Sequence, residues 1–534
     1  MFSQVTSIGL VGLEGYRIEV ETDLSNGLPL FEIVGLADTA VKEARERVRA
    51  AIRNTGCPFP NRRIIVNLSP ADTRKEGSGF DLPIAIGILA ASGILPSAGT
   101  EPSIAFCGEL ALDGSLRPVD GILCKAFAAR ESGCAVLAVP ARNAREASLV
   151  GGLCVLPVET LGDLCRHLTG ECLLKPYDGA APIACGKPHA GMPPAGDGHA
   201  LALAAGSARA CDDFCEVRGQ EGARRALEVA AAGGHHVLMV GTPGAGKTML
   251  ARRVAGILPD PVYEEALEIT RIHSVAGLLD MQAGLVSRRP FRAPHHSISH
   301  TALIGGGRVP RPGEISLAHG GVLFLDELPE FSRYALDSLR QPLEEGRVVL
   351  SRVQATVSYP SRFMLIAAAN PCKCGNRGDP ERVCTCPPQD AERYFSRLSG
   401  PLLDRMDLRV RVPALSWTEA ARSSPGESSC AIRLRVEAAR RRQTERYAGT
   451  GVLCNAQLGG SGITRWCALD AEGERMLQHS FTRFGMSMRA HDRILRVART
   501  IADLEGSSAI RLPHLAEALH YRQRFTGGTE GGAS

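Results

Sequence analysis

The segment GTPGAGKTML, from Gly241 to Leu250, combines glycines, a lysine and a hydroxyl side chain at a spacing that suits phosphate chemistry. Glycines let a loop turn so that its backbone N–H groups face phosphates, the lysine reaches the β- and γ-phosphates, and the next hydroxyl binds Mg²⁺. An apolar strand before the loop and a helix after it are the context that this motif requires. The segment therefore predicts an ATP site made of Gly241, Thr242, Pro243, Gly244, Ala245, Gly246, Lys247 and Thr248.

Polar side chains follow two further apolar segments. GGVLFLDELPEF is typical of a strand that ends in Asp326 and Glu327, and FMLIAAAN ends in Asn370. Asp326 is suited to hold Mg²⁺ through water, and Glu327 to polarise the water that attacks the γ-phosphate. Asn370 is suited to orient that water. An acidic pair after a strand is usually a solvated strand end, but beside the glycine loop it indicates catalysis.

The order of these segments along the chain is similar to that of the AAA+ ATPases. After the glycine loop, the DE strand and the Asn strand end, GPLLDRMDL places Arg405 in a polar loop. In the tail, MSMRAHDRILRVART predicts a helix that begins near Arg489. The resemblance implies that Asn370 is sensor 1, that Arg405 is a finger reaching a neighbouring subunit's ATP, and that Arg489 is sensor 2. A finger acting in trans implies a homo-oligomeric ring.

Longer stretches resemble one group of these ATPases. FRAPHHSISHTALIGGG, PRPGEISLAHGGVLFLDELPEF and NPCKCG look like the magnesium-chelatase-like AAA+ group and, within it, the ComM/YifB-type competence proteins. GLADTAVKEARERVRAAI near the start and RILRVARTIADLEG near the end also fit, so the resemblance covers nearly the whole chain. It implies a hexameric motor that moves along single-stranded or branched DNA, independently of sequence, and drives branch migration during natural transformation.

Four of the 17 cysteines cluster in CKCGNRGDPERVCTC, as two C-x-C pairs separated by nine residues. Two close pairs joined by a Gly/Pro loop can converge on one tetrahedral Zn²⁺, and such a site is structural because no coordination position stays open. The alternative is a surface loop of reduced thiols. The candidate ligands are Cys372, Cys374, Cys384 and Cys386.

The front of the chain resembles the proteolytic domain of Lon, which uses a serine nucleophile and a lysine base. In KEGSGFD the nucleophile's place falls on Gly79, and Ser78 is one residue away. In PVDGIL the lysine's place falls on Leu123, and Lys125 comes two residues later. Both chemical groups are thus expected to be lost. The resemblance then implies a non-proteolytic domain for ring assembly or DNA contact.

The elements that must position these residues alternate between strands and helices, which predicts the α/β class. ADTAVKEARERVRAAIRNTG has the apolar spacing of an amphipathic helix, with Asp38 as its cap. LPIAIGILAASGIL is too short to span a bilayer and is typical of a buried helix. The predicted organisation is a Lon-protease-like (S5-like) domain at 1–168, a flexible linker at 169–212, a P-loop AAA+ α/β core at 213–415, and a C-terminal helical lid domain at 416–534.

The overall composition indicates the broad class of protein and its possible partners. The chain has 534 residues, of which 44% are apolar and 22% charged, and its net charge of +4 neither demands nor excludes a nucleic-acid partner. Aromatic residues make up only 5%, which argues against a surface built on base stacking. No targeting segment is visible, and most cysteines are scattered as in proteins of reducing compartments. We therefore expect a cytoplasmic protein without a membrane partner.

Arginines supply candidate DNA contacts. EEGRVVLSR and the following ATVSY predict a hairpin whose Arg347 and Arg352 either contact phosphates or are solvated charges. The run RLRVEAARRRQTER is more typical of a solvated helix face. Two other functions compete with the DNA motor. One is the motor subunit of a magnesium-chelatase-type metal-insertion enzyme, and the other is an ATP-dependent protease, which Gly79 and Leu123 disfavour.

Overall fold

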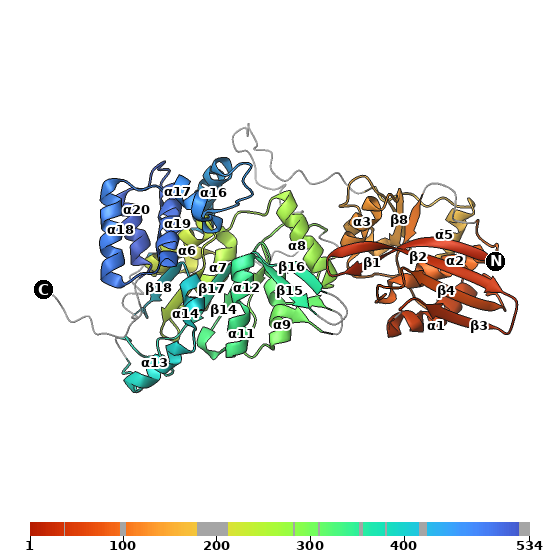
Figure 1. The fold of residues 1–534 in the computed structure, drawn as a ribbon, viewed down its shortest axis with the longest axis horizontal. Coiled ribbons are helices and arrows are strands. Elements are labelled where there is room, and N and C mark those ends of the chain that lie inside the picture. Colours follow the sequence, from red (N-terminus) through yellow and green to blue (C-terminus); the bar gives the residue numbers. More distant parts are fainter. Residues whose placement is uncertain are drawn as a thin grey trace.

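A computed structural model shows two bodies along the chain, a front domain and a core that is followed by tail helices (Figure 1). No helix among the described residues is long and apolar enough to cross a membrane. Residues 179–211 of the predicted linker, residues 523–534 and Arg352 lie outside the described part. The structure describes residues 1–36, 38–96, 103–178, 212–280, 284–307, 310–351, 356–379, 382–415 and 424–522.

The front domain is built on a seven-stranded mixed sheet in the order β3-β4-β2-β1-β5-β8-β9. β1 pairs antiparallel with β2, and β2 antiparallel with β4, while the pairs β3–β4, β1–β5, β5–β8 and β8–β9 are parallel. Its strands are β1 (Phe2–Val11), β2 (Glu14–Ser25), β3 (Leu30–Val34), β4 (Arg63–Ser69), β5 (Ile104–Phe106), β8 (Val136–Pro140) and β9 (Cys154–Val158), with a small β6 (Glu109–Leu110) and β7 (Leu116–Arg117) pair beside them.

Helices of the front domain follow the apolar patterns of the sequence. The Asp38 side chain caps the first helix by accepting a hydrogen bond of 2.8 Å from the Val41 N–H, so the predicted cap is confirmed. The predicted buried helix is also confirmed, because α2 is buried along its whole length. The helices are α1 (Thr39–Asn54), α2 (Asp81–Ala91), α3 (Ile122–Glu131), α4 (Ala144–Ala147) and α5 (Leu161–Leu168).

The core is built on a five-stranded parallel sheet in the order β11-β14-β17-β10-β18. The three middle strands, β14, β17 and β10, are fully buried, as expected where helices cover both faces of a parallel sheet. Because the strands are parallel, the segments that follow them emerge at one edge. The strands are β10 (Val237–Gly241), β11 (Phe291–Arg292), β14 (Val322–Leu325), β17 (Met364–Ala369) and β18 (Leu408–Val412).

Two hairpins and several helices surround the core sheet. The predicted hairpin around Arg347 is present as β15 (Arg347–Ser351) paired with β16 (Thr356–Pro360). A smaller hairpin joins β12 (Gly305–Gly306) and β13 (Arg311–Pro312). The core helices are α6 (Glu221–Gly233), α7 (Lys247–Ile257), α8 (Tyr263–Val275), α9 (His300–Ile304), α10 (Glu314–Leu317), α11 (Arg333–Ser338), α12 (Arg340–Glu345), α13 (Pro388–Ser396) and α14 (Gly400–Arg405).

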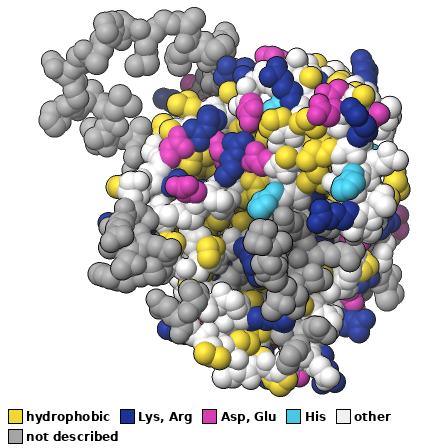
Figure 2. All heavy atoms as spheres, turned by 90° about the vertical axis from the view of Figure 1, so that its left-hand side faces the viewer, with side chains coloured by type: hydrophobic (Ala, Val, Ile, Leu, Met, Phe, Trp, Pro, Cys, Tyr) yellow, Lys and Arg dark blue, Asp and Glu magenta, His cyan; other side chains and the backbone are white. Residues whose placement is uncertain are grey.

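The tail is helical, and its arginines are largely engaged within the protein. Arg435 pairs with Glu427 and with the buried Glu228, and Arg446 pairs with the buried Asp503. Figure 2 shows basic and acidic side chains interspersed on the end of the molecule where the tail helices lie. Several arginines of this run therefore form structural ion pairs. The tail helices are α16 (Ser429–Arg446), α17 (Gly460–Trp466), α18 (Ala471–Phe484), α19 (Met488–Leu504) and α20 (Leu512–His520).

The front domain packs against α8 of the core (Figure 1). Ser274 at the end of α8 is central to this junction. Its hydroxyl donates to the carboxylate of the buried Glu146, and its carbonyl accepts a hydrogen bond of 3.1 Å from the Gly121 N–H. Arg271 reaches the Leu13 carbonyl at 3.0 Å. Burial raises the pKa of Glu146 above the usual range of a glutamate. Polar groups of both bodies thus satisfy one another at this junction.

Candidate nucleotide site and cysteine cluster

The glycine loop leaves the end of β10 and enters α7 directly. Gly244 and Gly246 have φ angles of +81° and +89°, a region that residues with a side chain rarely adopt. Nothing lies within 4 Å of the position that a Cβ of Gly244 would take, so the loop is open on that side. Thr242 is buried, and its hydroxyl has no hydrogen-bond partner among the described residues. The loop thus presents an open, polar cradle at the start of a helix.

Lys247 is the first residue of α7, and its amine is held inside the loop. The Nζ atom donates to the carbonyls of Gly241 at 2.6 Å and Thr242 at 2.9 Å, and to Oδ1 of Asn370 at 3.0 Å. Burial lowers the pKa of the Lys247 amine below its usual value, and the carboxylates of Asp326 and Glu327 act in the opposite direction. The lysine therefore links the glycine loop to the end of β17.

Asp326 joins the loop to the end of β14. The Thr248 hydroxyl donates to Oδ2 of Asp326 at 2.6 Å, and Oδ1 of Asp326 accepts from the Glu327 N–H at 2.9 Å. A hydroxyl beside a carboxylate, next to a lysine and an open glycine loop, is the oxygen-rich donor set that Mg²⁺ with a triphosphate requires. The residues present fit ATP and Mg²⁺. The structure brings Lys247, Thr248, Asp326 and Asn370 together as a single cluster.

Glu327 has an unusual backbone conformation. Its φ angle is +51°, although it is not a glycine, and its side chain is 50% exposed. The ring of His296 lies beside it, with Nδ1 3.3 Å from Oε2 of Glu327. Sequence reasoning missed His296. The signal was available, because PHHS follows β11 and β11 runs parallel to β14, so both segments emerge at the same edge of the sheet.

Arg405 lies in a different environment from the one expected. It is the last residue of α14, not part of a loop, and it is 7% exposed. Its guanidinium pairs with the Glu344 carboxylate and donates to the Pro401 carbonyl at 2.6 Å. Burial lowers the pKa of Arg405 below that of an ordinary arginine. The Gly and Pro at the start of this short segment indicated a loop. The burial of Leu402 against the core instead stabilises one helical turn.

Arg489 is exposed at the start of α19 and lies among arginines that repel the charge of Arg405 electrostatically. Arg493, one turn along the same helix, donates to the Arg405 carbonyl at 2.5 Å and to Asp407 at 2.7 Å. The tail therefore contacts the core just beyond Arg405. Within the described ranges, the contacts of the glycine-loop residues do not include Arg405 or Arg489, so these two arginines form a second group.

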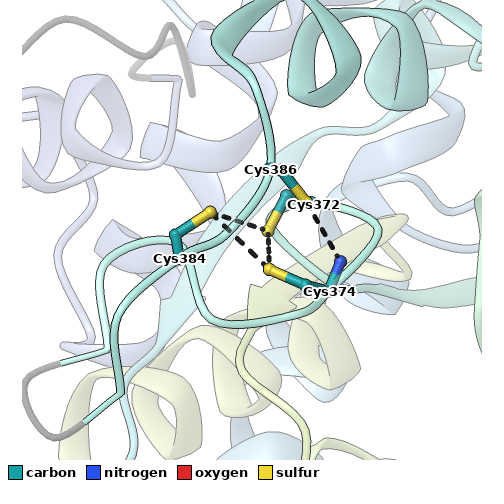
Figure 3. A group of neighbouring side chains, drawn as sticks. All are labelled: Cys372, Cys374, Cys384 and Cys386. Atoms are coloured by element: carbon teal, nitrogen blue, oxygen red, sulfur yellow. Dashed lines mark hydrogen bonds between the residues drawn. The ribbon is translucent and has the colours of Figure 1, made fainter.

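The four clustered cysteines converge in the loop that follows β17, and their side chains point toward one another (Figure 3). Their ligand atoms all lie within 4.8 Å of one another, and the Sγ atoms of Cys372, Cys374 and Cys384 are 3.3 to 3.6 Å apart. Sulfur ligands that share one zinc at about 2.3 Å lie about 3.8 Å apart in a tetrahedron. The geometry therefore fits one metal ion held by Cys372, Cys374, Cys384 and Cys386.

The cysteine loop also touches the glycine loop. A Cβ on Gly375, whose φ is +83°, would lie 2.5 Å from Cδ and Cγ of Pro243. Only a residue without a side chain allows this approach. Any displacement of the cysteine loop therefore acts directly on the loop that forms the phosphate cradle.

In the front domain, the structure shows which of the two candidate side chains, Leu123 or Lys125, lies next to Gly79. The Nζ atom of Lys125 lies 2.9 Å from the place of a Cβ on Gly79, whereas Leu123 is fully buried. Residues that are two positions apart on a helix face roughly opposite sides. Lys125 therefore faces Gly79, and Leu123 does not. Ser78 points elsewhere, since its hydroxyl donates to Glu109. An amine therefore lies beside residue 79, which as a glycine carries no hydroxyl.

Comparison with known protein families agrees with this geometry. Three family models match: subunit ChlI of Mg-chelatase at 20–143, magnesium chelatase subunit ChlI at 213–420, and the ChlI C-terminal region at 426–522. The sequence is 44% identical to the competence protein ComM of Haemophilus influenzae, over 97% of each chain. It is also 44% identical to YifB of Escherichia coli, over 96% of this chain and 95% of YifB.

The parallel sheet with its glycine loop, together with these matches, defines a magnesium-chelatase-like protein with an α/β core. Within this class the chain belongs to the ComM/YifB-type family. Membership of this family implies the use of ATP and Mg²⁺ and suggests ATPase activity. The geometry of the site agrees with both. The similarity to the magnesium-chelatase 67 kDa subunit of Chlorobaculum tepidum is narrower, with 30% identity over 30% of this chain and 23% of that subunit.

Proposed function

We propose that this protein is an ATP-hydrolysing, homo-hexameric ring motor that moves along DNA and promotes branch migration in recombination and natural transformation. The observation that carries the proposal is the similarity to the competence protein ComM over 97% of each chain, front domain included. A motor that acts on chromosomal DNA would work in the cytoplasm, and we propose that location.

The proposed roles of the site residues follow from their contacts. The backbone N–H groups from Gly241 to Gly246 and the Lys247 amine bind the phosphates of ATP, and Thr248 with Asp326 holds Mg²⁺. The Glu327 carboxylate takes the proton of the attacking water. We propose that Asn370 orients that water, and its contact with the Lys247 amine at 3.0 Å supports this role. Mg²⁺, when bound, neutralises charge on the phosphates.

The second group of arginines supports a shared site. Arg405 and Arg489 come from different parts of the chain, yet they lie in one electrostatic environment and outside the contacts of the glycine loop. We assign Arg405 as the finger and Arg489 as sensor 2, both dependent on ring assembly. Since Arg405 is paired with Glu344 in one subunit, the finger must leave this carboxylate when it reaches a neighbouring nucleotide.

We propose that residues 1–168 form a Lon-protease-like, non-proteolytic domain and residues 416–534 a helical lid. The front domain carries an amine at Lys125 but no hydroxyl at Gly79, so the attacking group of a serine–lysine pair is absent from that position. Its turn at Gly12 packs on Val357 of β16, where a Cβ on Gly12 would lie 2.2 Å from Cγ1 of Val357. This contact supports a role for the front domain in holding the hairpin β15–β16 in position.

The hairpin is the proposed DNA contact. Arg347 is exposed at the start of β15 and its guanidinium lies 3.2 Å from the Glu345 carboxylate, so a DNA phosphate can replace that surface partner. A magnesium-chelatase-type motor subunit is the alternative function, which the names of the matching family models favour. The full-length match to ComM, against 30% coverage for the chelatase subunit, favours the DNA motor.

ATP turnover with and without DNA tests this proposal. We expect single-stranded or branched DNA to stimulate turnover of the wild-type protein severalfold, because the ring is proposed to use ATP for movement along DNA. The stimulation should fall at high salt, since phosphate contacts weaken as counterions compete. Lys247→Ala is the control for contaminating activity. If ATP turnover does not change with DNA but changes with a metal-insertion partner, the chelatase function is correct and the DNA motor is not.

We further propose that the four cysteines bind one structural Zn²⁺. Plasma mass spectrometry should find about one zinc per chain in the wild type and none in a Cys384→Ser/Cys386→Ser variant. The variant should unfold at least about 5 °C lower, because metal binding contributes directly to folding. Cys430→Ser changes an exposed thiol outside the cluster and should alter neither quantity. Wild-type protein without metal after purification in zinc-supplemented buffer would contradict the assignment.

A further inference from the structure

The segment that carries Arg405 lies at the edge of the core sheet opposite to the glycine loop. Arg405 and Asp407 come just before β18, whereas the glycine loop follows β10, and these two strands are parallel neighbours. The Asp407 N–H donates to the His236 carbonyl at 2.9 Å, just before β10. The five residues of β10, about 16 Å of strand at about 3.3 Å per residue, separate this point from the loop. Arg405 is therefore held away from the phosphate cradle of its own subunit.

The carboxyl end of α14, where Arg405 lies, is bound by groups of the tail. The last carbonyls of a helix have no partner within the helix and need donors from elsewhere. The Arg493 guanidinium of α19 donates to the Arg405 carbonyl at 2.5 Å. The Arg522 guanidinium, just after α20, donates to the Met406 carbonyl at 2.6 Å. Two arginines of the tail thus hold the backbone at the end of this helix.

Arg493 is itself fixed by a carboxylate with little exposure. Its guanidinium lies 2.7 Å from Oδ1 of Asp407, and the two side chains are 17% and 6% exposed. The other oxygen of Asp407 accepts from the His236 N–H at 3.2 Å. Hydrogen bonds between charged groups are roughly twice as strong as those between neutral groups. Arg493 therefore joins the tail helix α19, the end of α14 and the start of β10 at one point.

We propose that Arg493 is a positioning residue that connects the finger helix α14 to the tail helix α19 and so determines where Arg405 is presented to the neighbouring subunit's ATP. Arg489 lies four residues before Arg493, one turn earlier on α19. Any movement of this helix moves Arg493, and the Arg405 backbone follows because its carbonyl is bound. The Arg405 side chain needs a fixed base, since it must leave Glu344 to reach a nucleotide. Arg493 acts through Arg405 and does not itself touch ATP.

This inference rests on the proposed role of Arg405 as the finger, and the kinetics of an Arg493→Gln variant test it. Glutamine is uncharged and two bonds shorter, so its amide cannot reach both partners. We expect kcat to fall about tenfold to a hundredfold, as for loss of one charge-assisted hydrogen bond, with KM for ATP unchanged. Arg493→Lys keeps the charge and should lose less. If Arg493→Gln fails to fold, Arg493→Lys should still show a lower kcat at unchanged KM.

Arg446→Gln is the matched control for a purely structural effect. Arg446 is also a tail arginine that pairs with a buried carboxylate, and its contacts are with Asp503 and Tyr447 of the tail. Both glutamine variants should melt at a lower temperature, but only Arg493→Gln should lose kcat. Equal losses of kcat in folded rings of both variants would overturn the positioning role.

Mixed rings show in which subunit Arg493 acts. Arg493→Gln subunits keep an intact Lys247, and Lys247→Ala subunits keep an intact Arg493, so a mixture contains complete interfaces. While subunits exchange, it should turn over more ATP per subunit than Arg493→Gln alone. A mixture that reaches only the diluted rate of the Arg493→Gln subunits would place Arg493 in the ATP site of its own subunit and overturn the inference.

Comparison with Arg405→Ala separates this inference from the finger assignment. The double variant Arg405→Ala/Arg493→Gln should be no slower than Arg405→Ala, because the effect of Arg493 passes through Arg405. If Arg493→Gln keeps the wild-type kcat while Arg405→Ala is slow, Arg493 does not position the finger. If Arg405→Ala itself turns over ATP at the wild-type rate, both the finger assignment and its positioning by Arg493 are wrong.

Discussion

A Lys247→Ala variant will not bind ATP, whereas a Glu327→Gln variant will bind ATP and fail to hydrolyse it. The two losses differ because the residues act at different stages. The Lys247 amine, held by two loop carbonyls and Asn370, is the positive charge placed to meet the phosphates. Glu327 is proposed to take a proton only during hydrolysis, so its loss should lower kcat by about 10² to 10⁴ with little change in affinity.

Fluorescent-nucleotide titration and phosphate release measure the two effects separately. Glu330→Gln is the matched control, since Glu330 is an exposed carboxylate of the same segment whose partner, Arg397, is also at the surface. It should bind and turn over ATP as the wild type does. Turnover by Glu327→Gln at the wild-type rate would remove Glu327 from the mechanism and leave another group as the base.

Arg405→Ala subunits should bind ATP and turn it over about 10³-fold more slowly, because a guanidinium that offsets charge on the transferring phosphoryl group contributes at least this much. The substitution should not unfold the protein. The carboxylate it leaves behind belongs to Glu344, whose side chain is 55% exposed and can be hydrated. Circular dichroism and the melting temperature check this point.

Mixing Arg405→Ala with Lys247→Ala subunits tests whether the arginine acts across the ring. A mixed ring contains interfaces with an intact Lys247 on one side and an intact Arg405 on the other, so part of the activity should return. Arg397→Ala is the control, because this exposed arginine lies shortly before α14 and, among the described residues, contacts Glu330 and the Pro329 carbonyl of its own subunit. A mixture that stays inactive while subunits demonstrably exchange would show that Arg405 acts within its own subunit or not at all.

The sequence was informative where function depends on strand ends. In a parallel sheet the segments after β10, β14 and β17 must emerge at one edge, so the glycine loop, Asp326 and Asn370 could be expected to meet. Local rules also worked for the Asp38 cap, which depends only on the residues that follow it. The expected roles of Arg405 and Arg489 came from the family resemblance and not from the local sequence.

What the sequence could not supply are contacts between distant segments. The Arg405–Glu344 pair joins two helices that are 61 residues apart, and α14 itself forms because Leu402 packs into the core. Lys125 was displaced by two residues from the expected position, and only the start of α3 after the left-handed Gly121 decides which side chain faces Gly79. His296 and the approach of Gly375 to Pro243 likewise depend on tertiary placement.

The junction between the front domain and α8 bears on how the protein can be divided into fragments. A fragment that begins at Asp213 would lose the Glu146 partner of Ser274 and the Leu13 partner of Arg271, and would uncover Val357 where Gly12 now lies. The cut would leave polar groups and an apolar side chain of the core facing water. Truncation at the linker is therefore a change to the ATPase core itself, and the activity of such a fragment would report on a damaged surface as well as on a missing domain.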